Sequence, residues 1–164
     1  QIVGEKGVDK RIDILSAAIR AGMSVYDLEE LELAYAPQFG AAKDPVNMAG
    51  FVAANILKGD VEVVRWNDLD TLNREDTRLL DVRTGEEVKQ TGTIVDAVHI
   101  HVDELRDRLS ELDKRKTYIA YCTVSLRAYI AYRILVQNGF TARILSGGWE
   151  TWSPVQEDRL ERGG

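Results

Sequence analysis

The sequence contains few of the residues that build metal centres and disulfide frameworks. It has one Cys and two His among 164 residues. A single Cys excludes an internal disulfide framework and a Cys-rich zinc module, and it fits a reducing compartment. No uninterrupted apolar run approaches the length of a membrane span. The first residues, Gln1–Glu5, lack an initiator Met and both regions of a signal peptide. We therefore expect a cytoplasmic protein without membrane contact, whose sequence begins inside a longer chain.

Basic charge is also scarce. Lys and Arg number 21 against 27 Asp and Glu, giving a net charge of −6 and a pI near 5.0. A broad nucleic-acid-binding face is not expected from this balance. Neither the G-x-G-x-x-G nor the G-x-x-x-x-G-K-[ST] pattern occurs, so the chain alone is predicted to bind no dinucleotide or triphosphate cofactor. The hydrophobic fraction of 45% is sufficient for a packed core.

The first sixty residues have a helical pattern. Apolar residues spaced by three and four predict a helix from Asp9 to Gly22, with Asp9 as its N-cap. Ser24 opens a second short helix, and Asp44-Pro45 opens a third that ends at Lys58-Gly59. We place a domain boundary at Gly59-Asp60.

From Val61 the pattern changes to short apolar runs that alternate with helical segments. The predicted strands are 61–64, 79–82, 98–102, 117–121 and 142–145, and the predicted helices are 68–72, 85–89, 102–112 and 128–138. This alternation predicts an α/β domain with a mostly parallel five-stranded sheet. The three predicted segments are a helical part at 1–59, the α/β domain at 60–155 and a loosely held polar tail at 156–164.

The strongest candidate for chemistry is Cys122. The apolar run 117–121 leads directly into this Cys, four residues follow, and Arg127 introduces a helix. Ligands gather at the carboxyl ends of parallel strands, and the next helix would direct its free N–H groups at the loop. These groups and the fixed charge of Arg127 favour thiolate over thiol. The alternative is an inert core Cys, which is common at the end of an apolar strand.

A metal site is not predicted. His99 and His101 alternate along a predicted strand and would share one face, so with Cys122 they offer three ligands. No fourth ligand with suitable spacing is present. A structural hydrogen bond is the favoured role for His99.

Residues from about Val61 to Trp152 resemble a single rhodanese-homology domain. The matching segments are Trp66 with Leu69, Leu80–Thr84, Glu86-Glu87, Gly92, Ile94, Ala97–Ile100, Cys122–Arg127, Leu145–Trp149 and Trp152. The resemblance implies a three-layer sulfurtransferase fold in which Cys122 holds a sulfane sulfur as a persulfide. It implies that the backbone of Thr123, Val124, Ser125 and Leu126 stabilises that persulfide, with Arg127 beside it. Asp81 and Arg83 would be structural.

The same resemblance implies the substrates. The donor would be thiosulfate or a low-molecular-weight persulfide, and the acceptor a thiol. The sequence departs from many relatives at Ser125 and Ala128, where Gly is usual, and at Val95-Asp96, where a Pro-Gly pair is usual. It also has His101 where relatives have Pro. Ser125 would strain the loop if its position needs a positive φ, or its hydroxyl would cap the next helix.

Two alternatives to sulfur transfer stay open. A related phosphatase would have a Cys-to-Arg loop one residue longer and a carboxylic general acid over it, and no residue stands out in that role. The other alternative is a non-catalytic sulfur-relay or docking module in which Cys122 is not activated.

The first segment resembles the end of the dimerisation domain of flavin-dependent pyridine-nucleotide disulfide reductases. The matching segments are Gly7–Asp13, Asp27-Leu28, Leu31–Pro37, Ala42–Asn47 and Ala49-Gly50. The nearest branch is the coenzyme A-disulfide reductases, some of which carry a C-terminal rhodanese domain. The resemblance implies a homodimeric parent protein that uses FAD, NAD(P)H and coenzyme A, with its N-terminal reductase domains outside this sequence. In that branch the tyrosine matching Tyr35 reaches the partner subunit's active site; without that site, a buried packing role is favoured here.

Overall fold

The computed structural model describes residues 2–38 and 40–162. The chain forms two compact units, residues 1–60 and residues 61–164. None of the helices among the described residues is long and apolar enough to cross a membrane.

Unit 1 contains three helices, α1 (Val8–Arg20), α2 (Val25–Glu29) and α3 (Pro45–Leu57). Ser24 and Asp27 form a reciprocal capping box at the start of α2. The Asp44 side chain accepts a hydrogen bond from the Val46 N–H at 3.0 Å, which caps α3 as predicted. The prediction that Asp9 caps α1 is wrong, because the helix begins at Val8 and Gly7 occupies the N-cap.

The packing of α2 on α3 depends on a glycine. A Cβ added at Gly50 would lie 2.8 Å from the Glu29 nitrogen and 2.9 Å from the Val25 oxygen, so only Gly permits this approach. The Asn47 amide donates to the carbonyls of Leu28 and Leu31. These bonds satisfy the end of α2, where helical partners run out.

Tyr35 is not a packing residue. It is 58% exposed, so the expected burial of this side chain is wrong. Pro37 and Gly40 predict a loop over residues 35–40, and the structure has a turn at Pro37-Gln38 within it. Phe39, which belongs to that predicted loop, lies outside the described residues.

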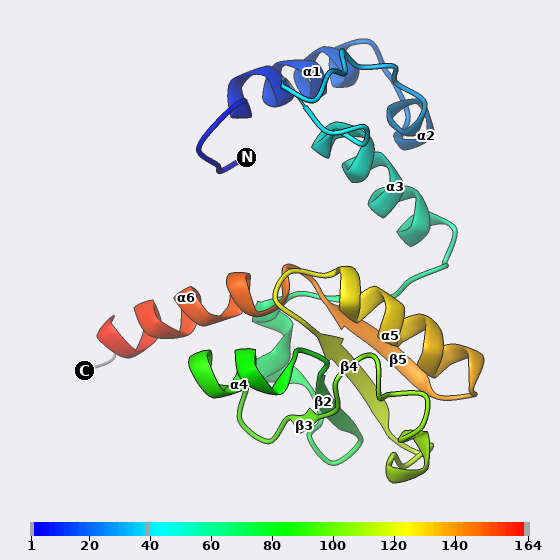
Figure 1. Cartoon of the computed structure of the whole chain (residues 1–164), viewed down its shortest axis with the longest axis vertical. Helices are drawn as coiled ribbons and strands as arrows, with labels where there is room; N and C mark the ends of the chain where they lie inside the picture. Colours follow the sequence, from blue (N-terminus) through cyan, green and yellow to red (C-terminus); the bar gives the residue numbers. More distant parts are fainter. Residues whose placement is uncertain (1, 39, 163–164) are drawn as a thin grey trace. The chain divides into compact units, whose positions relative to one another are not determined.

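Unit 2 is built on a five-stranded parallel sheet of order β1-β5-β4-β2-β3 (Figure 1). The strands are β1 (Val63–Val64), β2 (Thr77–Asp81), β3 (Val98–His99), β4 (Thr117–Tyr121) and β5 (Thr141–Leu145). All four strand pairings are parallel. The predicted strand at 98–102 is shorter than expected, although the Ile100 and Val102 N–H groups still donate to the carbonyls of Asp81 and Val82.

The sheet separates two hydrophobic clusters. One lies between the sheet and α5 (Leu126–Gln137) and includes Leu80, Ala120 and Leu135. The other includes Leu79 and Ile119, with Trp149 and Trp152 of α6 (Gly148–Arg162) packed against it. Alternate residues of β2 and β4 therefore enter opposite clusters, as strand geometry requires. The result is the three-layer α/β arrangement that the alternating pattern predicts.

The remaining helical segments are shorter. They are η1 (Trp66–Thr71), α4 (Gly85–Thr91) and η2 (Leu109–Glu111). The predicted helix over 102–112 is wrong: turns with i+3 hydrogen bonds run from His101 to Arg108 and lead into η2. The buried residues Val102 and Leu105 are three apart, a spacing that such turns bring to one side without a regular α-helix.

The segment predicted as a loose polar tail is helical through Arg162, in continuation of α6. Ion pairs explain this difference. Arg162 pairs with Asp158 one turn earlier, and Arg159 pairs with Asp70 and lies 5.1 Å from the Trp66 ring centroid. Polar composition alone does not distinguish such a tethered helix from a tail.

Asp96 has an unusual backbone conformation. Its φ of +64° lies in the left-handed region that favours glycine. Many relatives have a Pro-Gly pair where this chain has Val95-Asp96, so Asp96 stands at the usual position of the glycine. Asp tolerates the left-handed region better than most residues with a Cβ, so the turn forms at a moderate cost.

Candidate active site

The site lies at the carboxyl edge of the sheet. Strand β4 ends at Tyr121, Cys122 follows at once, and α5 begins at Leu126. The neighbouring strands β2 and β5 end at Asp81 and Leu145, so Arg83 and Gly148 reach the same edge. This is the edge where parallel α/β sheets collect ligands.

The start of α6 fixes the backbone of the Cys122 loop. The N–H groups of Trp149 and Glu150 donate to the carbonyls of Cys122 and Thr123 at 2.9 and 3.0 Å. A Cβ added at Gly148 would lie 2.6 Å from the Val124 oxygen and 2.8 Å from the Thr123 oxygen. Gly148 has a φ of +58°, so both its conformation and its contacts require glycine.

This anchoring sets the direction of the loop amides. In a trans peptide the N–H points away from the C=O of the same unit. Because the carbonyls of residues 122–124 face α6, the N–H groups of Thr123, Val124 and Ser125 face the opposite side. The Cys122 side chain belongs to the cluster on the α5 side of the sheet, and α6 packs on the other cluster. The amides and the thiol therefore lie on one side of the loop.

Cys122 itself is completely buried. It shares a cluster with Ala128 and Ala131 of α5. The next residues along the loop are more open, since Val124 is 53% and Leu126 69% exposed. The Cys122 side chain is therefore enclosed, whereas the side chains of Val124 and Leu126 in the same loop are exposed.

Ser125 adopts a φ of −167°, which is extended backbone. The strain considered for a non-glycine residue at this position is therefore absent. Its hydroxyl donates to the Val124 carbonyl and does not cap α5. Ala128 is the other residue that replaces the usual glycine. It is completely buried in the hydrophobic cluster between the sheet and α5.

Arg127 is held by Glu87 of α4. Two hydrogen bonds of 2.7 and 2.6 Å join its guanidinium to both carboxylate oxygens, and a third, of 2.8 Å, reaches the Thr123 hydroxyl oxygen. Thr123 in turn donates to Glu87 at 2.7 Å. The hydrogen bonds to Glu87 raise the pKa of Arg127. Arg127 is therefore fixed beside the loop by a carboxylate.

The Glu87 carboxylate stays ionised. The hydrogen bonds from Arg127 hold the pKa of Glu87 far below its ordinary value, with Thr123 and Thr84 adding to the effect. Glu87 also accepts from the Thr84 N–H and hydroxyl, which completes a capping box at the start of α4. A carboxylate held in this state has no proton to donate, so it does not supply the general acid that a phosphatase would need.

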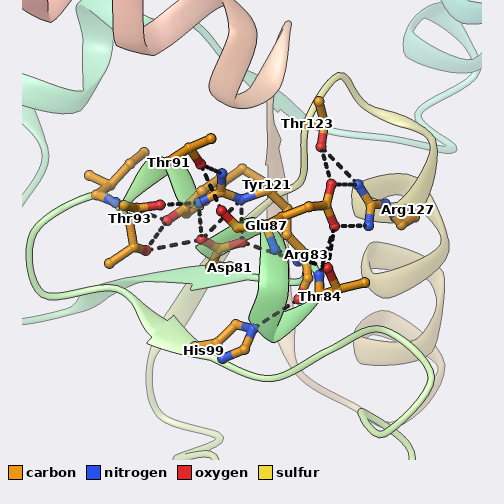
Figure 2. A network of polar contacts seen from close by, with 12 residues as sticks. Asp81, Arg83, Thr84, Glu87, Thr91, Thr93, His99, Tyr121, Thr123 and Arg127 are labelled. Carbon is orange, nitrogen blue, oxygen red and sulfur yellow. Dashed lines mark hydrogen bonds and ion pairs between the residues drawn. The ribbon is translucent and has the colours of Figure 1, made fainter. Parts of the chain in front are cut away.

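A second polar network lies deeper in the unit. Figure 2 shows Arg83 forked onto Asp81, with hydrogen bonds of 3.0 and 2.6 Å from its Nε and Nη2. The same guanidinium donates to the Thr91 hydroxyl and the Gly92 carbonyl. Burial alone would raise the pKa of Asp81, but the hydrogen bonds and charge of Arg83 outweigh it and lower that pKa.

Tyr121, Thr93 and His99 extend this network. The Thr93 hydroxyl donates to Asp81 and lies 2.7 Å from the Tyr121 oxygen, which accepts from the Ile94 N–H. Burial raises the pKa of Tyr121. His99 Nε2 lies 2.8 Å from the Arg83 carbonyl oxygen (Figure 2). The network joins β2, β3 and β4 to the 91–94 segment.

A cavity of about 330 Å³ lies between α4 and α6 beside the loop. The residues that line it are Arg83, Glu87, Gln90, Thr91, Thr123, Trp149, Glu150, Ser153 and Pro154. Trp149 and Trp152 pack against the core with ring centroids 5.2 Å apart, and Trp149 also lines this cavity.

Within residues 2–38 and 40–162, no group of three His, Cys, Asp or Glu side chains is arranged to hold a metal ion. His101 does not extend β3 alongside His99. Its Nδ1 lies 3.7 Å from an Asp103 oxygen in the turn that follows.

Two residues of this site were not identified from the sequence. Glu87 was noted as part of the family resemblance, but its spacing from Thr84 indicates only a helix cap. Its contact with Arg127 joins residues 40 positions apart. Gly148 likewise appeared only in a matching segment. The Gly147-Gly148 pair indicates a turn, but no local pattern shows that Gly148 supports the loop after Cys122.

The comparisons with known proteins agree with this architecture. Residues 67–154 match the rhodanese-like domain family, and the chain belongs to that family. The resemblance that the sequence motifs indicate is thus confirmed for the second unit.

Particular relatives extend the match beyond this domain. The reduced CoADR-RHD of Bacillus anthracis is 42% identical with a TM-score of 0.89, and the match covers 94% of this chain and 28% of that one. The NAD-dependent persulfide reductase from A. fulgidus is 39% identical with a TM-score of 0.78, covering 91% and 26%. Coenzyme A disulfide reductase of Staphylococcus haemolyticus is 48% identical over 54 residues, 33% of this chain and 12% of that protein. The chain therefore spans about an eighth of this relative and about a quarter of the two larger structures.

Proposed function

We propose that unit 2 is a sulfurtransferase module that carries sulfane sulfur on Cys122 for a larger reductase. The observation that carries this proposal is the anchoring of the loop carbonyls by Gly148, Trp149 and Glu150. With the carbonyls of residues 122–124 turned toward α6, the matching N–H groups would lie on the side of the Cys122 sulfur. N–H groups aimed at a sulfur atom stabilise negative charge on it.

The proposed reaction has two displacements. The Cys122 thiolate attacks the outer sulfur of a donor, for example thiosulfate; the donor S–S bond breaks, and sulfite leaves with the bonding electron pair. A second thiolate then attacks the outer sulfur of the Cys122 persulfide and restores the Cys122 thiolate. The chain needs no oxidant for either step. The backbone N–H groups from Thr123 to Arg127 and the Arg127 guanidinium would face the anionic persulfide.

The parent protein is the second part of the proposal. Relatives named coenzyme A disulfide reductase and NAD-dependent persulfide reductase support a reductase with a nicotinamide cofactor and a coenzyme A-linked thiol, persulfide or disulfide substrate. The flavin is implied by the family resemblance. In such a homodimer the exposed Tyr35 would be free to reach the partner's active site, as the family resemblance implies. This chain would supply the sulfur-carrying step.

The complete burial of Cys122 favours a second candidate, a docking module that transfers no sulfur. A sulfite-release assay separates the two functions. The chain is mixed with thiosulfate and a small acceptor thiol, and sulfite is measured against Cys122→Ser. Sulfite from the natural chain and none from the variant supports sulfur transfer. Equal background rates would overturn it and leave the docking function. An aryl phosphate in a parallel reaction tests the phosphatase alternative, and we expect no hydrolysis.

A further inference from the structure

The charges beside Cys122 limit which donors the loop can favour. The four side chains between Cys122 and Arg127 are uncharged. Arg127 uses two hydrogen bonds on Glu87 and one on Thr123. Arg83, which lines the adjoining cavity, pairs with Asp81 at 2.6 Å. Each of these two arginines is therefore matched by a carboxylate.

Two acidic side chains add negative charge near the same loop. Glu87 and Glu150 both line the cavity next to Thr123. Glu150 is exposed, and its N–H anchors the Thr123 carbonyl, which keeps the residue beside the loop. An approaching anion thus finds the nearest cation, Arg127, already paired with the Glu87 carboxylate, and Glu150 adds negative charge on the α6 side of the loop.

This matters because sulfur donors differ in charge. Thiosulfate carries two negative charges and releases sulfite, whereas an organic thiosulfonate carries one and releases a sulfinate. Two unit charges about 5 Å apart in water interact by about 0.8 kcal/mol, roughly a fourfold change in rate or affinity, and by more where the dielectric constant is lower. An arginine that is paired with a carboxylate does not give the second negative charge of thiosulfate this extra attraction.

We infer that Glu87 is a specificity-determining residue: by pairing with Arg127 it lowers the preference of the loop for doubly charged inorganic donors relative to singly charged organic ones. This inference rests on the proposed sulfur transfer by Cys122. A purely structural role for Glu87, as the cap of α4, would not change the ratio between two donors.

Glu87→Gln is the sharpest variant. Gln at this helix position can retain the capping box with Thr84 but removes the negative charge that Arg127 faces. Glu86→Gln is the matched control, because Glu86 is exposed in the same turn of α4 and its removal also changes the net charge by one. The assay measures kcat/KM for thiosulfate from sulfite release and for benzenethiosulfonate from benzenesulfinate release.

In Glu87→Gln we expect the thiosulfate-to-benzenethiosulfonate ratio of kcat/KM to rise about five- to tenfold. In Glu86→Gln it should stay within about twofold. An unchanged ratio in a folded Glu87→Gln variant overturns the inference while leaving sulfur transfer intact. Release from neither donor by the natural chain instead overturns the proposed function.

Ionic strength gives a second readout that needs no variant. With Arg127 paired with Glu87 and a net charge of −6 on the chain, kcat/KM for thiosulfate should stay level or rise between 0.01 and 0.5 M salt, because salt screens the repulsion of the dianion more than any attraction. A fall of tenfold or more would show that the dianion meets an uncompensated positive charge, and would contradict the inference even if Glu87→Gln failed to fold.

Discussion

The two arginine–carboxylate pairs of unit 2 have similar distances but different surroundings. Arg83 and Asp81 are 1% and 0% exposed, and every polar neighbour of the pair is itself hydrogen-bonded into the sheet network. Arg127 and Glu87 are 27% and 32% exposed and lie against the Cys122 loop. The buried pair joins elements of the fold, whereas the partly exposed pair lies against the loop after Cys122. The first pair is therefore placed to stabilise the fold, and the second is the one to which we assign a role in donor preference.

The first way to break this comparison is Arg83→Ala. Removing the guanidinium leaves the Asp81 charge buried without its partner, so we expect unit 2 to lose about 3–5 kcal/mol of unfolding free energy. Urea unfolding followed by Trp fluorescence measures this, since all three Trp residues lie in unit 2. Arg108→Ala is the control. Arg108 pairs with Glu104 and Glu111 at the surface, so its loss should cost much less unfolding free energy than the loss of Arg83. Equal costs for the two variants would contradict the assigned difference.

Gly148→Ala tests how the start of α6 holds the backbone of the Cys122 loop, without changing any charge. The new Cβ would press on the carbonyls of Thr123 and Val124 and occupy a positive φ, so we expect a cost of about 1–3 kcal/mol. Sulfite release should fall as well, because the amides would lose their direction. Gly139→Ala separates the two causes: Gly139 has a φ of +78° but its Cβ would have only an ordinary contact. This control should lose stability by about 1 kcal/mol without losing transfer.

The Glu87 carboxylate also predicts a pH dependence. Its pKa is lowered in the folded chain, so the stability it contributes is fully present above the unfolded value of about 4.3 and is lost as pH falls toward the folded value. The difference in unfolding free energy between the natural chain and Glu87→Gln should therefore be largest above about pH 5 and shrink at lower pH. Comparing the two chains cancels the contribution of Asp81. Urea unfolding at pH 3.5 and pH 7 measures it, and a difference that grows on acidification would contradict the assignment.

The smallest expected effect is at Asp96. Glycine at this left-handed position removes backbone strain but adds freedom to the unfolded chain, so Asp96→Gly should stabilise unit 2 by about 0.5 kcal/mol. Val95→Gly adds the same freedom without relieving a positive φ and should destabilise by about 0.5–1 kcal/mol. If both variants shift stability in the same direction, the strain assigned to Asp96 is wrong.

What the sequence predicts well is local. The cap at Asp44, the helix start at Ser24, and strand β4 leading into Cys122 each follow from residues a few positions apart. These signals depend on hydrogen bonds and side-chain periods within one element, which a sequence displays directly. The order of the rhodanese motifs then indicates the fold of unit 2.

What it predicts poorly depends on contacts between distant segments. The helix expected over 102–112 is replaced by turns, and the tail expected to be loose is held by Asp70, 89 positions from Arg159. Glu87 and Gly148 act on a loop that neither adjoins in sequence. Tyr35 was expected to be buried because the partner's active site lies outside this chain, but its side chain is largely exposed among the described residues.

Intact-mass analysis of the full chain tests the central claim most directly. After incubation with thiosulfate and removal of the excess, the mass should increase by one sulfur atom, the added atom should map to the peptide that contains Cys122, and a thiol should remove it. Cys122→Ser should gain nothing. A natural chain that stays at its starting mass under conditions in which thiosulfate loads another sulfurtransferase would contradict the account.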